Sequence, residues 1–356
     1  MHLLVDISAH GYGHVAQTAP VINELKRQLP GLRVTVRSAA PLSLLQQRIN
    51  GEFQHHPLAF DFGMRMANAV DVQVRESAEA YRLFHADWKY KVGLEAEAMA
   101  RLKPDVLLAN VPYLSLAAAQ QAGVRAAGMC CLNWADIYRH YCVQDEPSRI
   151  IHAQMLEAYN SAECFLQVQP TMPMPDFTRA RGIGPISQLG RPQRARMAEK
   201  CSLHDGEKIV LVAMGGMEFR LPMERWSHLP GVHWLAPQAW GIQRDDVTAF
   251  ETLGLSFSDV LASSDAVLTK PGYGTFAEAA CAGVPVIYVT RRDWPEEAYL
   301  VRWLSHNGVC LEVERGALLD GDLSVLLQNL WAQPKPPGPQ ATGASEAARI
   351  LLENYF

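Results

Sequence analysis

Two glycine-rich turns are the segments of this 356-residue sequence best placed to do chemistry. The first, Ser8-Ala-His-Gly-Tyr-Gly-His-Val-Ala16, carries His14. The second, Thr269-Lys-Pro-Gly-Tyr-Gly-Thr-Phe-Ala277, carries Lys270. Glycines let the backbone approach a ligand closely, and the start of a helix presents free N–H groups and a positive dipole end to phosphate. Because each turn stands between a predicted strand and a predicted helix, both predict contact with a phosphate-bearing ligand.

A dinucleotide site is one hypothesis, since both turns match the loose fingerprint G-x-G-x-x-A. In that case an acidic ribose ligand should end the second strand, about 20 residues after the first turn. Arg37 and Ser38 stand there instead, although an arginine could suit a phosphorylated ribose. The second turn also follows a late strand of its domain. The fingerprint alone therefore gives weak support to a nicotinamide-dependent oxidoreductase.

The elements around the first turn form a strand–helix–strand unit. An apolar run over 2–7 predicts a buried strand, helical spacing follows over 21–29, and 32–37 alternates as a second strand. Such a unit implies a parallel sheet. The same alternation returns later in the chain, with strands expected at 105–109, 124–132, 164–168, 208–214, 266–269 and 284–289, and helices at 115–122, 150–162, 275–282, 323–330 and 344–355.

The length suggests two domains, at roughly 150 residues per domain. Residues 170–192 hold five prolines and three glycines, which predicts a linker or a long boundary loop. We therefore expect a first α/β domain over 1–185, a second over 186–338, and a C-terminal helix within 339–356.

Composition limits the partners and the compartment. The chain has 37 Asp and Glu against 32 Lys and Arg, a formal charge of -5, whereas nucleic-acid binding calls for a concentrated basic face. No apolar run approaches the roughly 18 residues that a membrane-spanning helix needs. Seven cysteines without a CxxC pair, and an N-terminus without a basic leader or cleavage site, predict a reduced, cytoplasmic protein.

The second turn and its continuation resemble the donor-binding motif of the UDP-glycosyltransferase superfamily. The turn is followed by Glu278 and then by Ala-Ala-Cys-Ala-Gly-Val-Pro-Val-Ile-Tyr-Val289. The stretch Leu189-Gly-Arg-Pro192 and the glycines after Met214 are similar to the start of that family's donor domain. The first turn resembles its acceptor-side Gly-x-His turn. The N-terminal region of L-arabinokinases shares both turns.

This resemblance implies two facing Rossmann-like domains, the GT-B type, with the active site in the cleft between them. The implied activity is inverting transfer of a sugar from a nucleotide diphosphate, UDP first, to an unknown acceptor, with no cofactor and no metal. The last helix would cross back to the first domain. The partners would be a nucleotide sugar and an acceptor, and a homodimer is compatible with the sequence.

On the donor side, the resemblance assigns the diphosphate to Gly274 and Thr275, and the ribose diol to Glu278 one turn later. Lys270 stands where the family often has histidine and keeps a cation near the phosphates. The family's sugar-binding Asp-Gln pair appears as Asp293-Trp294, with acidic residues close by. The full donor-side set is Gly215, Gly216, Lys270, Gly272, Tyr273, Gly274, Thr275, Glu278, Asp293, Glu296 and Glu297. Arg291 and Arg292 are expected to be surface charges.

On the acceptor side, Gly11 and Gly13 form the turn, and His14 is the implied general base. An aspartate usually orients that histidine, but Asn110 stands at the matching place. An amide can position an imidazole but cannot stabilise imidazolium by charge. Asp136 is an alternative base.

The sequence is also compatible with other hypotheses about function. A sugar-nucleotide epimerase or hydrolase would use the same two domains, and a non-catalytic module could bind a sugar nucleotide without turning it over. Asp320-Gly-Asp322 spells a metal-binding D-x-D, but its place before a predicted helix favours capping. Cys130 and Cys131 lie in an apolar strand and are expected to be inert core. Trp134, Tyr138 and Tyr141 could line an acceptor groove or pack in the core, and His55, His56 and His85 lack metal-site spacing.

Overall fold

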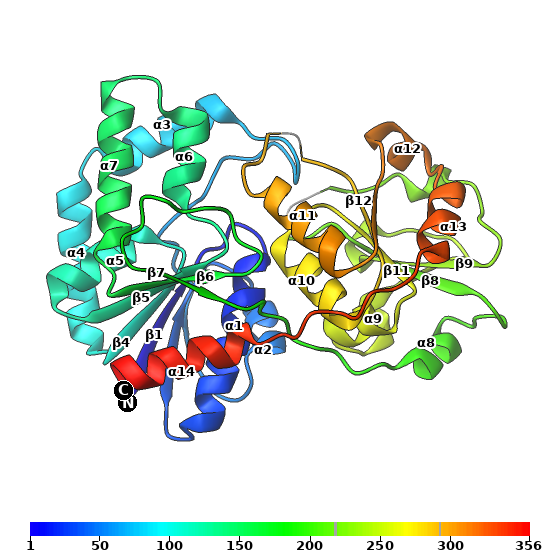
Figure 1. Ribbon diagram of the computed structural model, residues 1–356, viewed down its shortest axis with the longest axis horizontal. Coiled ribbons are helices and arrows are strands. Elements are labelled where there is room, and N and C mark those ends of the chain that lie inside the picture. Colours follow the sequence, from blue (N-terminus) through cyan, green and yellow to red (C-terminus); the bar gives the residue numbers. More distant parts are fainter. Residues whose placement is uncertain (217–218, 292) are drawn as a thin grey trace. The chain divides into compact units, whose positions relative to one another are not determined.

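The computed structural model describes residues 1–216, 219–291 and 293–356 (Figure 1). They form two compact units. The first unit comprises 1–67, 71–186 and 342–356, and the second comprises 68–70 and 187–341. The sequence predicts domain boundaries after residues 185 and 338, whereas the two units divide after residues 186 and 341. Each unit is described below by itself.

The first unit is built on a parallel sheet of seven strands, as far as the chain is described. Their order across the sheet is β3-β2-β1-β4-β5-β6-β7, and every pairing is parallel. All six residues of β1 are buried, as expected for a central strand covered on both faces. The strands are β1 (His2–Ile7), β2 (Arg33–Arg37), β3 (Gln54–His56), β4 (Val106–Asn110), β5 (Arg125–Cys130), β6 (Cys164–Val168) and β7 (Ala180–Ile183).

Helices connect these strands, and the last helix of the chain also belongs to this unit. They are α1 (Gly13–Gln28), α2 (Leu42–Arg48), α3 (Val74–His85), α4 (Trp88–Leu102), α5 (Tyr113–Ala122), α6 (Trp134–Cys142), α7 (Glu146–Asn160) and α14 (Gly343–Tyr355). Helix α14 packs on α1 and β7 (Figure 1, red). A Cβ atom at Gly184 would overlap Thr342, so the chain approaches itself closely where α14 begins. The C-terminal helix is therefore part of the first unit.

The second unit has a sheet of its own, with six parallel strands in the described part of the chain. Their order is β10-β9-β8-β11-β12-β13. The strands are β8 (Lys208–Ala213), β9 (Val232–Ala236), β10 (Val247–Ala249), β11 (Ala266–Thr269), β12 (Val286–Tyr288) and β13 (Cys310–Glu312). The helices are α8 (Arg194–Lys200), α9 (Phe257–Ser263), α10 (Tyr273–Ala282), α11 (Glu297–Asn307), α12 (Arg315–Asp320) and α13 (Ser324–Ala332), with short 3₁₀ helices η1 (Met223–Arg225), η2 (Gln238–Trp240) and η3 (Phe250–Leu253).

Both sheets reverse their strand order at one point. In the first unit this point lies between β1 and β4, and in the second between β8 and β11. Ligands of open parallel sheets bind at the carboxyl ends of the strands at such a switch point. The first turn leaves β1 beside Asn110 at the end of β4, and the second leaves β11 beside the end of β8. Each glycine turn therefore occupies the ligand-binding position of its own sheet.

The predicted fold class, α/β with two parallel sheets, is confirmed, but some elements differ. The segment 170–192 contains strand β7, which pairs with β6 and was expected to be loop. Three of its four residues are exposed, so no apolar pattern announced it. The capping role of the D-x-D residues is also wrong, because Asp320 ends α12 and, among the described residues, no side chain caps α13, whose N-cap is Leu323. Among the described residues, no helix combines the length and the apolar character that crossing a membrane requires.

A buried ion pair ties β1 to β2. The Arg37 guanidinium donates to both Asp6 oxygens at 2.7 and 2.6 Å and to Glu95 at 2.5 Å. Arg37 and Asp6 are both almost fully buried. The guanidinium lies at the end of β2, where a dinucleotide fold would bind its ribose. Its charge is balanced internally, which removes the main support for a phosphorylated-ribose site.

Arg37→Met should lower the free energy of unfolding by about 3–5 kcal/mol, because it leaves a buried carboxylate without its cation. Urea unfolding of this variant and of the native protein measures the difference. Arg125→Met, which breaks an exposed pair with Glu163, is the control and should change stability far less. A loss below about 1 kcal/mol for Arg37→Met would show that this pair does not stabilise the sheet.

Candidate active site

His14 is held at the switch point of the first unit. The chain leaves β1, turns through Gly11 at a φ of +92°, and enters α1, so that His14 is the second residue of the helix. Its side chain is buried, and Nδ1 lies 2.8 Å from Oδ1 of Asn110. The residue at the end of β4 thus contacts the histidine that the sequence places after β1.

Hydrogen bonds beyond Asn110 fix which of its amide atoms faces the histidine. Asn110 Nδ2 donates to Oε1 of Gln17 at 3.2 Å, and Gln17 Nε2 donates to Sγ of Cys131 at 2.8 Å. Asn110 Oδ1 is left facing His14, and a carbonyl oxygen only accepts. His14 Nδ1 therefore carries a hydrogen, and Nε2 is the atom that can take up a proton.

Two buried titratable groups, Cys130 and Asp61, interact with the imidazole. Burial disfavours the imidazolium, but interactions with neighbouring groups, chiefly with Cys130, whose Sγ lies 3.7 Å from Nδ1, together raise the pKa of His14 to about 9. The hydrogen bond to Asn110 and the charge of Asp61 act in the same direction. Burial likewise opposes the Cys130 thiolate, yet hydrogen bonds with Cys131 and His14 lower the pKa of Cys130 to about 6. Cys130 is buried in the core, as its apolar strand predicts, and its Sγ also contacts the imidazole of His14.

Asp61 is a buried carboxylate that the sequence analysis missed. It accepts hydrogen bonds from Ser8 Oγ at 2.8 Å and from Trp134 Nε1 at 2.7 Å. The Trp134 ring lies 5.8 Å from the His14 ring and 5.0 Å from the His10 ring. Burial raises the pKa of Asp61, while the charge of His14 lowers it. No sequence motif marks Asp61, which lies in the loop between β3 and α3.

Asp136, the alternative base, is engaged elsewhere. Asn133 Nδ2 donates to its Oδ2 at 2.8 Å, while the Asn133 side chain caps α6 by accepting from the Asp136 N–H. Arg139 forms an ion pair with Asp136 at 2.7 Å. The structure thus brings Asn110, the predicted partner of His14, to the imidazole, and holds Asp136, the alternative base, within α6. Trp134 and Tyr138 are fully buried, which favours core packing over an acceptor groove.

In the second unit, Lys270 lies between the two glycine-ended strands. A Cβ at Gly215 would lie 3.7 Å from Lys270 Nζ, and one at Gly272 would lie 3.6 Å from it. Gly215 has a φ of +82°, a conformation that favours glycine, and Gly216 follows it. The lysine amine, the exposed backbone at Gly215 and the half-buried backbone at Gly272 therefore lie close together at this switch point.

Helix α10 begins at this place. Gly272 is its N-cap and has no side chain that could cap the first turn, where the backbone N–H groups of a helix lack partners within the helix. Tyr273 is buried, whereas Gly274 and Thr275 are half-buried at the start of the helix. Glu278 follows one turn later and is buried. This is the arrangement of an anion site at a helix N-terminus.

The acidic segment after β12 packs on itself. Glu297 accepts from the Arg291 backbone N–H at 2.8 Å, and its carboxylate lies 3.9 Å from Arg291 Nε. The Arg291 guanidinium lies over the Trp294 ring, and Trp294 Nε1 donates to Glu296 at 3.1 Å. Asp293 has a φ of +74°. Arg291 is only 5% exposed, so the expectation of a surface charge is wrong; Arg292 lies outside the described residues.

These charges act on Lys270. Burial lowers the pKa of Lys270 to about 7, and the positive charge of Arg291 adds to the effect. The carboxylates of Glu296 and Glu297 oppose it. Burial raises the pKa of Glu297 to about 7, partly offset by Arg291. The site thus contains an amine that can gain a full charge when an anion arrives.

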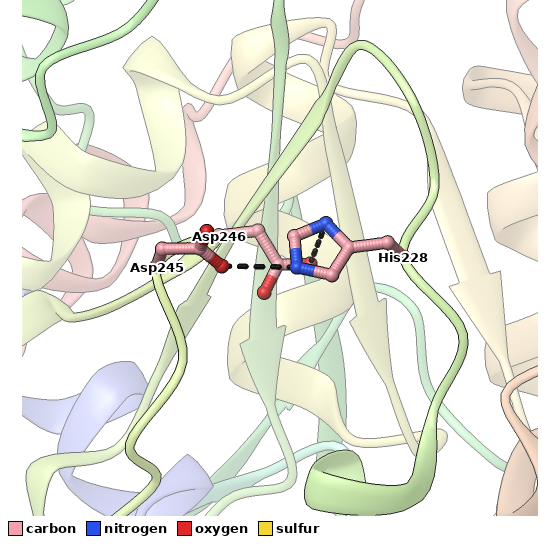
Figure 2. A group of neighbouring side chains, drawn as sticks. All are labelled: His228, Asp245 and Asp246. Atoms are coloured by element: carbon pink, nitrogen blue, oxygen red, sulfur yellow. Dashed lines mark hydrogen bonds and ion pairs between the residues drawn. The ribbon is translucent and has the colours of Figure 1, made fainter.

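Among the described residues, one group of side chains has metal-ligand spacing: His228, Asp245 and Asp246 (Figure 2). His228 Nε2 lies 2.9 Å from Asp245, and Nδ1 lies 3.5 Å from Asp246. Arg244 donates to both carboxylate oxygens of Asp246, at 2.7 and 2.6 Å. The cluster is an ion-pair network, and its arginine already balances the buried aspartate.

Comparison with known proteins identifies the fold. No protein-family model matches the chain. Solved structures of similar fold include the glycosyltransferase VinC in complex with dTDP (14% identity, TM-score 0.56, 100% of this chain and 95% of that one) and Arabidopsis thaliana UGT89C1 (15%, 0.61, 99% of each). The chain has the fold of the GT-B glycosyltransferases. The calicheamicin glycosyltransferase CalG4 shares it as well (16%, 0.58, 99% and 94%).

A sequence relative points the same way. The chain is 24% identical to L-arabinokinase of Arabidopsis thaliana over 362 aligned positions, which cover 98% of this chain. They cover only 34% of that protein, so the GT-B chain spans about a third of its relative.

The chemical reactivity of Lys270 should reflect its environment. Because the neutral amine is the reactive form, acylation of Lys270 should reach half its maximal rate near pH 7, well below the ordinary lysine pKa near 10.4. Peptide mass spectrometry across a pH series measures this. Arg291→Met should move the midpoint upward, because a positive charge is removed. A native midpoint above pH 9 would contradict the described environment.

Proposed function

We propose that the chain is an enzyme that transfers a sugar from a nucleoside diphosphate, most simply UDP, to an acceptor hydroxyl. The observation that carries the proposal is that, in a chain with the GT-B fold, each of the two sheets has a candidate functional group at its own switch point. One presents a histidine with an oriented imidazole, and the other presents a lysine, glycine backbone and an uncapped helix start. The reaction would invert the anomeric centre and need no metal.

The second unit would bind the donor. The diphosphate would lie against Gly215, Gly272 and the start of α10, where glycine backbone, helix N–H groups and Lys270 supply positive potential. An anion beside Lys270 raises its pKa, so binding near neutral pH would take up a proton and restore the charge. Glu278, one turn into the helix, would accept hydrogen bonds from the ribose diol. In support, VinC was solved with dTDP and UGT89C1 with UDP.

The first unit would supply the base. His14 Nε2 would take the proton of the acceptor hydroxyl while that oxygen attacks the anomeric carbon and the diphosphate leaves. Such help is typically worth about 10²–10⁴ in rate. Asn110 would hold the ring in the tautomer that this step requires. Because only neutral imidazole accepts a proton, transfer should rise with pH until His14 is deprotonated, near pH 9.

A second candidate is a module that binds a sugar nucleotide without turning it over. Two observations favour it: the residue beside His14 is a neutral amide, and the raised pKa of His14 makes it imidazolium at neutral pH. An imidazolium donates a hydrogen bond to phosphate and takes up no proton. An epimerase or hydrolase of the same fold is a third reading, distinguished by its product.

Glu278→Ala should weaken UDP binding by about 1–3 kcal/mol, because a hydrogen bond to a charged group is lost. Isothermal titration calorimetry measures the affinity, and Glu314→Ala, at an exposed glutamate of the same unit, is the matched control. Titrations in EDTA should give the native affinity. Equal affinity of Glu278→Ala and native protein would remove Glu278 from the site, and loss of binding in EDTA would disprove metal independence.

His14→Ala should leave UDP affinity within a few-fold of native while lowering transfer at least about a hundredfold, the low end of general-base catalysis. It should also abolish the rise of rate with pH up to about 9. Product formation from a panel of UDP sugars and acceptors, with UDP binding as the control, tests both points. If His14→Ala instead weakens binding and transfer equally, the histidine contacts the donor; near-native transfer would exclude it as the base.

A further inference from the structure

In the described part of the chain, the side chain that hydrogen-bonds to the imidazole of His14 within 3 Å belongs to a neutral residue, Asn110. Asn110 accepts from Nδ1 at 2.8 Å and fixes the ring, but an amide carries no charge. An imidazolium in a buried site is costly unless an anion compensates it. Orientation and charge compensation must therefore come from different groups.

Cys130 is the other group at the same ring nitrogen. Its Sγ lies 3.7 Å from His14 Nδ1, and the side chain is fully buried at the end of β5. The adjacent Cys131 accepts from Gln17, which in turn holds Asn110. A chain of hydrogen bonds thus runs from Cys131 through Gln17 and Asn110 to His14, and Cys130 contacts His14 at the end of this chain.

We propose that Cys130 is the acidic partner of His14, so that the resting site holds a thiolate–imidazolium pair. The S–H bond of Cys130 breaks, and its proton reaches Nε2, the ring nitrogen that carries none in the neutral tautomer. Nδ1–H then points toward Asn110 Oδ1 with the thiolate close by, and the net charge is unchanged. Cys130 acts here as a positioning residue that stabilises the charged ring.

The surrounding titratable groups are compatible with this pair. Asp61 faces the same ring, and its charge would add to that of the thiolate. Cys131 hydrogen-bonds to Cys130, which favours the thiolate. Tyr159 interacts with Cys130, and burial raises the pKa of Tyr159 well above 10, so it stays neutral. The shifts of His14 and Cys130, in opposite directions, agree with an ion pair.

The thiolate has a direct signature, because thiolates absorb in the far ultraviolet where thiols do not. Titration of the native protein from pH 5 to 8 should give an absorbance step equal to one thiolate, with a midpoint near 6. Cys130→Ser should remove the step. His14→Ala should remove it as well, because burial without the imidazolium disfavours the thiolate. Cys142→Ser is the matched control, since Cys142 is buried and burial raises its pKa to about 11; the step should remain.

Absence of the step in native protein would overturn the proposal, and so would its persistence in His14→Ala. If Cys130→Ser does not fold, the same absorbance titration can be made on Cys130→Ala. Comparison of native protein with His14→Ala also tests whether the thiolate depends on the imidazolium. The catalytic role of the pair rests on the proposed function, but the absorbance needs no substrate, so the two can fail separately. If transfer occurs, its pH profile in Cys130→Ser should shift to lower pH by at least one unit.

Discussion

The hydrogen bond between His14 Nδ1 and Asn110 Oδ1 is the contact on which the first unit's chemistry depends. It joins the turn after β1 to the end of β4, the two strands that flank the switch point. It also decides which ring nitrogen holds hydrogen and which is open. Without this hydrogen bond, either ring nitrogen of His14 could carry the hydrogen. The position of the ring relative to the buried Cys130 thiol and Asp61 carboxyl would then not be fixed.

The candidate site of the second unit also lies at a switch point of its sheet, but it is formed by glycine backbone and a lysine. Parallel strands on either side of a switch point leave a space at their carboxyl ends that only backbone and short side chains can border. Glycine at both strand ends leaves that space open, and Lys270 places its amine there. Its lowered pKa follows from burial and from Arg291, itself held by Glu297 and Trp294. Burial therefore has the largest effect on the charge of Lys270, and the segment after β12 adjusts it in both directions, through Arg291 and through Glu296 and Glu297.

Much of this could be predicted from the sequence. Continuous apolar runs bounded by turns gave β1, β6 and β11 their observed limits, and the motif resemblance pointed to Asn110 beside His14. The proximity of Asp61 and Cys130 to His14 could not be predicted, because it arises from strand order and loop path, which local spacing does not encode. Arg291 was misjudged for a related reason: only the fold shows that Trp294 covers it.

The proposed chemistry of the first unit requires His14 to be an oriented imidazole, protonated at Nδ1 toward Asn110, with a raised pKa. Nitrogen-15 NMR of histidine-labelled protein, assigned with His14→Ala, reports both the tautomer and the titration midpoint. We expect a midpoint near pH 9 and, above it, a neutral ring with hydrogen on Nδ1. A midpoint near the ordinary value of 6.5, or a neutral ring with hydrogen on Nε2, would contradict it.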